Sequence, residues 1–116
     1  MVLEVLVVDD EYADSICKYM KADFLNYSIN FHSTFSGEKA VKKIKENSYD
    51  LIILDYNLPE ENGYQIAKKL KSLRKNIKII GFSTGWNEVE AKEAGLVLYS
   101  CTKMPIINYI HKLLEK

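Results

Sequence analysis

Residues 51–55 read Leu51-Ile52-Ile53-Leu54-Asp55, a short apolar run that ends in a carboxylate. A run of this length and composition is typical of a strand that is buried on both faces of a parallel sheet. A charged group at its end is costly unless it has a partner or a chemical task. The arrangement recurs near the start of the chain, where the apolar run 5–8 leads into Asp9 and Asp10. These two runs predict two buried strands whose carboxylates share one acidic pocket.

The rest of the chain alternates short β-type runs with segments of helical periodicity. The expected strands are 3–8, 29–35, 51–54, 77–82 and 96–100. Residues 29–35 alternate between apolar and polar side chains, which suits an edge strand. The fourth helical segment, 87–94, is short and is stopped by Gly95. Five βα units in this order predict one α/β domain over residues 1–116, with a doubly wound parallel sheet, right-handed crossovers and a shortened fourth helix.

Composition excludes several classes of protein. Sixteen basic and sixteen acidic side chains cancel, so no overall field attracts nucleic acid or an acidic membrane. The apolar runs are far shorter than a membrane span, and the first residues do not resemble a signal peptide. Cys17 and Cys101 lack metal-ligand spacing and fit a reducing compartment. We therefore expect a cytoplasmic protein that binds neither nucleic acid nor membrane.

Polar groups that follow the expected strands should meet at one edge, because ligands of open α/β sheets bind outside the carboxyl ends of the strands. These groups are Asp9, Asp10, Asp55, Ser83 and Lys103. Three close carboxylates repel one another, and a hard divalent cation such as Mg²⁺ relieves the repulsion. A metal ion, an ammonium, a hydroxyl and a carboxylate nucleophile are together what phosphoryl transfer onto an aspartate requires.

Two motifs in this context resemble the receiver domains of bacterial two-component response regulators, of the stand-alone, chemotaxis-regulator-like type. They are Val7-Val8-Asp9-Asp10-Glu11 and Leu51-Ile52-Ile53-Leu54-Asp55-Tyr56-Asn57-Leu58-Pro59-Glu60-Glu61-Asn62-Gly63. The resemblance covers essentially the whole chain. It implies a flavodoxin-like fold whose five strands have the order 2-1-3-4-5.

The resemblance also implies a role for each matching residue. Asp55 is the expected phosphoacceptor. Asp9, Asp10 and Asp55 are expected to hold Mg²⁺, together with the backbone carbonyl of Asn57. Ser83 falls where the family has a hydroxyl that bonds the phosphoryl group and takes part in the switch.

The last third of the chain departs from the family pattern. The Lys-Pro pair of the family appears as Lys103-Met104-Pro105, and counting forward from Gly95 places Thr102 at the lysine position. We favour Lys103, because only an ammonium neutralises a phosphoryl group and one extra loop residue costs little.

The aromatic switch residue is ambiguous for the same reason. Tyr99 takes this position when residues are counted from Gly95, whereas Ser100 does so when they are counted back from Lys103; we expect Tyr99. Trp86, three residues after Ser83, is expected to pack within its loop, near the pocket.

The expected function is a phosphorylation-dependent switch that takes a phosphoryl group onto Asp55 from a histidine kinase or phosphotransfer protein. The sequence ends on the last helix, so we expect output through an unidentified downstream protein or onward phosphotransfer, and no enzymatic activity beyond self-catalysed phosphorylation and dephosphorylation. One alternative is a degenerate receiver that binds a protein without phosphorylation. The other is a phosphatase of the haloacid-dehalogenase type, which uses a second Asp where this chain has Asn57.

Overall fold

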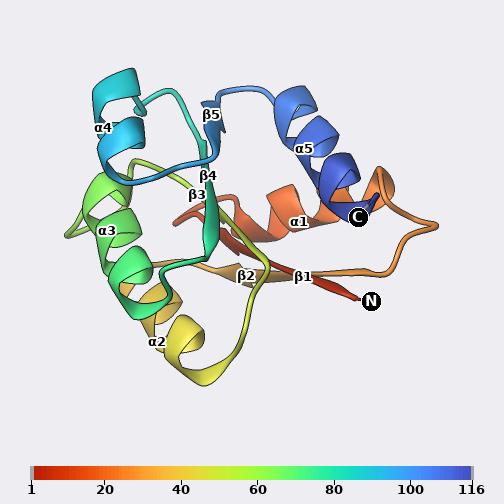
Figure 1. Ribbon diagram of the computed structural model, residues 1–116, viewed down its shortest axis with the longest axis horizontal. Coiled ribbons are helices and arrows are strands. Elements are labelled where there is room, and N and C mark those ends of the chain that lie inside the picture. Colours follow the sequence, from red (N-terminus) through yellow and green to blue (C-terminus); the bar gives the residue numbers. More distant parts are fainter. Residues whose placement is uncertain (1, 116) are drawn as a thin grey trace.

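Five parallel strands form the centre of the structure, a computed structural model that describes residues 2–115 (Figure 1). The strands are β1 (Leu3–Val8), β2 (Ile29–Thr34), β3 (Leu51–Leu54), β4 (Lys78–Phe82) and β5 (Leu98–Ser100). The helices in the described part are α1 (Ala13–Ala22), α2 (Gly37–Glu46), α3 (Gly63–Leu73), α4 (Glu88–Glu93) and α5 (Met104–Leu114). The strand order is β2-β1-β3-β4-β5, and every pairing is parallel. The predicted fold is confirmed.

The helices cover the two faces of the sheet in separate layers. Helices α1 and α5 lie on one face, and α2, α3 and α4 lie on the other (Figure 1). Successive side chains of a strand point to opposite faces. Leu3, Val5 and Val7 of β1 accordingly enter the α1–α5 core, while Leu6 and Val8 enter the α2–α3 core. Because β1 and β3 lie inside the sheet, their apolar runs are buried on both sides, as predicted.

β2 lies at the edge of the sheet, as its alternating pattern predicts, but its polar side is not uniformly exposed. Thr34 is only 2% exposed, whereas Phe35 is 41% exposed and lies outside the strand. The ladder ends at the pairing of Thr34 with Val8, so the strand stops one residue earlier than predicted.

β4 and β5 begin one and two residues later than predicted. The N–H of Ile77 donates to the Arg74 carbonyl in the turn after α3, and the N–H of Leu96 donates to the Ala91 carbonyl of α4. The backbone groups of Ile77 and Leu96 therefore belong to turns at helix ends. An apolar side-chain pattern alone does not distinguish such a turn residue from the first residue of a strand.

α4 is the short helix that the sequence predicts. It spans six residues between its N-cap, Asn87, and Gly95, whose φ of 72° stops the helix. A helix of this length is not stable by itself in water. Two phenol groups hold it in place: Tyr56 donates to Glu90 Oε1 at 2.8 Å, and Tyr64 donates to Glu93 Oε2 at 2.6 Å.

Trp86 fills the space between the β4–α4 loop and the sheet, so its side chain packs as expected, but against the sheet and not within its own loop. The side chain is buried, its Nε1 donates to the Leu54 carbonyl at 3.0 Å, and its ring meets that of Tyr56 edge-on at 5.1 Å. The indole needs Gly81 beneath it, because a Cβ at this position would lie 2.6 Å from Nε1.

The change Gly81→Ala is therefore expected to lower the free energy of unfolding by about 1–3 kcal/mol, the usual cost of overpacking a core. Denaturant unfolding measures the loss. Trp86→Phe should relieve part of the clash, so the double variant should lose less stability than the sum of the two single losses. Strictly additive losses would contradict the assigned contact.

Candidate functional site

Three carboxylates meet at the carboxyl edge of the central strands. Asp9 and Asp10 follow β1, and Asp55 follows β3, which pairs with β1 as far as Val8 and Leu54. One oxygen from each of the three carboxylates lies within 4.8 Å of the others. The predicted acidic pocket is therefore present.

Asp9 is fixed by the start of α1. Its Oδ1 accepts the N–H groups of Glu11 at 2.9 Å and of Tyr12 at 2.8 Å, and the residue is only 7% exposed. Among the described residues, no hydrogen bond engages its Oδ2, so this oxygen is available to a ligand. Asp10 is exposed and lies on the solvent side of the cluster.

Asp55 is a buried carboxylate whose pKa is raised. The residue is 8% exposed, and burial is the main cause that raises the pKa of its carboxyl above the ordinary value. The charges of Asp9 and Asp10 raise this pKa further. The N–H of Asn57, 3.2 Å from Oδ1, and the hydroxyl of Ser83 oppose the shift without cancelling it. The fold thus holds Asp55 in a position that disfavours its negative charge.

Ser83 lies beside Asp55 at the end of β4, as predicted. Its Oγ accepts the N–H of Tyr56 at 3.2 Å and the N–H of Gly85 at 3.4 Å. One hydroxyl therefore joins the loop that follows Asp55 to the loop that precedes α4.

Lys103 is not in contact with the cluster. Its Nζ lies 3.2 Å from Asp23 Oδ2 and 5.3 Å from the centre of the Tyr19 ring. Within residues 2–115, no basic side chain forms an ion pair with Asp9, Asp10 or Asp55. The role of Lys103 in phosphoryl binding stays a prediction.

The other residues considered for the lysine and switch positions lie on or next to β5. The N–H of Thr102 donates to Ser100 Oγ at 3.0 Å, and this hydroxyl donates to the Thr102 carbonyl at 2.9 Å, so both residues are engaged in a local turn. Tyr99 is 42% exposed and pairs with Gly81 of β4. Its proposed switch role also stays a prediction.

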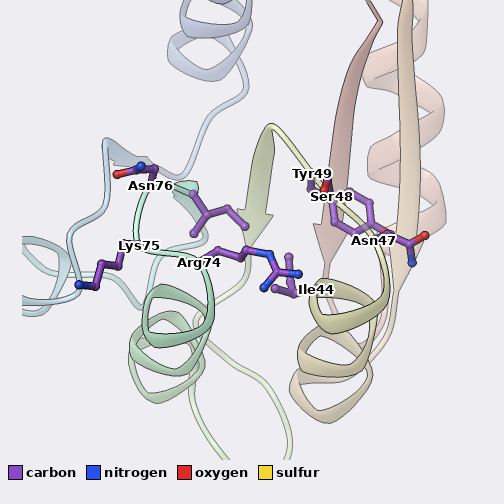
Figure 2. A pocket seen from close by; sticks show the side chains of 8 residues that line it. Ile44, Asn47, Ser48, Tyr49, Arg74, Lys75 and Asn76 are labelled. Atoms are coloured by element: carbon purple, nitrogen blue, oxygen red, sulfur yellow. The ribbon is translucent and has the colours of Figure 1, made fainter.

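A separate hollow of about 310 Å³ lies at the opposite end of the sheet, between the ends of α2 and α3 (Figure 2). Ile44 and Ile77 are its buried members, and Arg74 extends toward it from the end of α3. None of the predicted site residues lines this hollow, so the chemistry is concentrated at the carboxyl edge.

Comparison with known proteins agrees with this geometry. The family model described as the response regulator receiver domain matches residues 5–102. The chain belongs to this family. Receiver domains are phosphorylation-dependent switches that take phosphoryl groups from histidine kinases and bind Mg²⁺ at their aspartate cluster. The family assignment thus explains the three carboxylates, whereas Lys103 lies one residue beyond the matched segment.

Similar proteins include a curated relative and two solved structures. The transcriptional regulatory protein SrrA of Staphylococcus aureus (strain NCTC 8325 / PS 47) is 36% identical over 94 residues, which cover 79% of this chain and 38% of SrrA. The structure of TrrA from Thermotoga maritima, in complex with Mg²⁺ and BeF, is 27% identical with a TM-score of 0.77, over 97% of this chain and 100% of that one. Chemotaxis protein CheY4 of Vibrio cholerae is 22% identical with a TM-score of 0.77, over 98% and 100%. The chain thus spans well under half of the length of the regulator SrrA.

The described residues contain no helix that is long and apolar enough to cross a membrane.

Several residues that shape the site escaped the sequence analysis. Asp23 and Tyr19 hold Lys103, and Glu90 receives the hydroxyl of Tyr56. The high tyrosine content of the sequence was the one feature that could have indicated the contacts made by Tyr19 and Tyr56, but it does not show which partners these side chains reach.

The perturbed Asp55 carboxyl should make stability depend on pH. Its pKa is higher in the folded state than in the unfolded state, so its contribution is fully present below the unfolded pKa and is lost as pH rises through the folded pKa. Without metal, Asp55→Asn should therefore raise the free energy of unfolding at pH 7 by about 0.5–2 kcal/mol.

Denaturant unfolding in a chelator, repeated at pH 7 and near the ordinary carboxyl pKa of 3.8, checks this expectation. The gain should shrink at the lower pH. Glu46→Gln, which removes an exposed charge on α2 away from the cluster, is the control variant. An Asp55→Asn variant that is less stable than the wild type at pH 7 would contradict the assignment.

Proposed function

We propose that this chain is a Mg²⁺-dependent switch in which Asp55 accepts a phosphoryl group from a histidine kinase or a histidine phosphotransfer protein. The observation that carries the proposal is the position of Asp55: a buried carboxylate with a raised pKa, beside two further carboxylates and the hydroxyl of Ser83. A structural role alone does not account for three carboxylates placed together against their mutual repulsion.

The donor set fits a hard divalent cation. All three side chains offer oxygen, Asp9 keeps Oδ2 free of protein hydrogen bonds among the described residues, and no described cation neutralises the cluster. Asp9, Asp10 and Asp55, with the backbone carbonyl of Asn57, would hold the ion. When bound, Mg²⁺ supplies positive charge to the oxygens of the phosphoryl group. The similarity to TrrA, whose structure is a complex with Mg²⁺ and BeF, supports this proposal.

The transfer step uses Asp55 in its ionised form. One carboxylate oxygen forms a bond to phosphorus while the bond between phosphorus and the imidazole nitrogen of the donor breaks, and the imidazole leaves with that electron pair. The product is an aspartyl phosphate. The hydroxyl of Ser83, already beside Asp55, is placed to donate a hydrogen bond to a phosphoryl oxygen.

The contacts of Ser83 offer a route from the site to α4. Its Oγ accepts the N–H groups of Tyr56 and Gly85. Rotation of the Ser83 hydroxyl toward the phosphoryl group therefore alters the contacts of both loops. The hydroxyl of Tyr56 donates to Glu90, which is part of α4. We infer that phosphorylation shifts α4 between two positions, and that Tyr99 on the adjacent strand responds.

Output through a protein partner is supported by apolar side chains around α4, β5 and the start of α5. The exposed members are Val89, Val97, Tyr99 and Met104. We propose that an unidentified protein in the cytoplasm binds this surface, or that Asp55 passes its phosphoryl group onward, without contact with nucleic acid or membrane.

A second candidate function is a degenerate receiver that binds its partner without phosphorylation. The pairing of Lys103 with Asp23 favours it, since the cluster then lacks the ammonium that stabilises a phosphoryl group.

Incubation with acetyl phosphate and Mg²⁺ separates the two functions. The wild type should gain the mass of one phosphoryl group, whereas Asp55→Asn should gain none, because it lacks the nucleophile. Asp50→Asn, which alters an exposed carboxylate at the other end of the sheet, should behave as the wild type. A wild type without mass gain would favour the degenerate receiver.

Mg²⁺ alone should stabilise the fold, because the ion relieves the repulsion among carboxylates that are separated in the unfolded chain. At a concentration one hundred times the dissociation constant, the free energy of unfolding should rise by about 2.7 kcal/mol. Asp10→Asn should abolish most of the gain, and it should otherwise fold normally since Asp10 is exposed. Denaturant unfolding at constant ionic strength measures this; equal gains in both proteins would disprove the metal site.

A further inference from the structure

Lys103 is held on the outer side of the β5–α5 loop by groups that belong to α1. Asp23 is the C-cap of α1, and its Oδ2 lies 3.2 Å from Nζ of Lys103. Tyr19, one turn earlier on α1, places its ring 5.3 Å from the same nitrogen. The ammonium thus has both an ionic partner and an aromatic one, and neither belongs to the acidic pocket.

The loop explains why the ammonium points outward. The β4–β5 register ends with Phe82 opposite Ser100, so Cys101 is the residue that follows on beside Ser83. The hydrogen bonds between Ser100 and Thr102 then close a turn, and Lys103 becomes the residue before α5. The extra residue in this loop therefore displaces the lysine from the edge where the carboxylates lie.

An open route nevertheless connects Lys103 with the pocket. One hollow, of about 290 Å³, is lined by Asp9 and Ser83 of the pocket. A second hollow, of about 380 Å³, is lined by Lys103. Both hollows include Tyr19, Phe82 and Cys101 in their linings, so they adjoin. The adjoining hollows leave open space beside Lys103 on the side that faces the pocket.

We propose that Asp23 is a positioning residue that keeps Lys103 in reserve, and that a phosphoryl group on Asp55 draws the ammonium away from it. This inference rests on the proposed function. The ion pair is partly solvated, with side chains 43% and 35% exposed, and a pair of this kind shifts an equilibrium by only roughly two- to fivefold. A phosphoryl group carries more charge than one carboxylate and accepts charge-assisted hydrogen bonds, so it wins the competition.

Two consequences follow from the competition. Asp23 slows phosphorylation, because Lys103 must leave it before it can stabilise the incoming group. Phosphorylation in turn frees the carboxylate of Asp23 and uncovers the ring of Tyr19, which changes the surface between α1 and α5. Phosphorylation of Asp55 then alters the surface between α1 and α5 as well as the surface at α4.

The rate of phosphorylation by acetyl phosphate and Mg²⁺ tests the inference. Asp23→Asn should react roughly two- to fivefold faster than the wild type, since it no longer retains the ammonium. Lys103→Gln should react more slowly, and adding Asp23→Asn to it should change nothing further. Asp23→Glu, which keeps a carboxylate at this position, should react at the wild-type rate. Glu46→Gln removes the same charge at a remote exposed site and is the matched control.

The inference is overturned if Asp23→Asn reacts at the rate of the control, or if its effect persists in the Lys103→Gln background. It is also overturned if a double-mutant cycle on the unfolding equilibrium finds no coupling between residues 23 and 103, a measurement that needs no phosphorylation. Failure of the proposed function has a different signature, in which the wild type and Asp55→Asn are equally unreactive.

Discussion

The confinement of like charges at one edge of a parallel sheet is the constraint on which the rest of this structure depends. The central strands β1 and β3 are buried on both faces, and each delivers a carboxylate to the same pocket. Asp9 is fixed there by two N–H groups of the turn that leads into α1, and Asp55 is held there in a buried position that raises its pKa. Because no basic side chain among the described residues forms an ion pair with these carboxylates, the site is prepared for a cation and for an incoming phosphoryl group.

Much of this core was predictable from the sequence. The runs that end at Asp9 and Asp55 are too apolar to lie anywhere but inside the sheet, and a parallel arrangement then requires their carboxyl ends to meet. The short α4 was also predictable, since Gly95 closes it soon after Ser83. These features depend on local patterns and on topology, both of which a single sequence records.

The contacts that connect the site to its surroundings were not predictable. Tyr56 reaches Glu90, Tyr64 reaches Glu93 and Lys103 reaches Asp23 across long separations in the chain. A long-range pair of polar side chains near the surface leaves no local pattern in the sequence. Chemical reasoning assigned Lys103 to the pocket. Its actual position depends on one additional residue in the loop after β5. In the structure the lysine is paired outside the pocket instead.

In the proposed switch, phosphorylation of Asp55 therefore changes the structure along two routes. One leads to α4 through Ser83 and Tyr56, and the other leads to α1 through Lys103 and Asp23. A crystal structure of the chain with Mg²⁺ and beryllofluoride tests the account most directly. The account predicts beryllofluoride on Asp55, Mg²⁺ bound by Asp9 and Asp10, and the ammonium of Lys103 turned from Asp23 toward the fluorides. An Asp55 carboxylate without beryllofluoride at saturating concentrations of both reagents would contradict it.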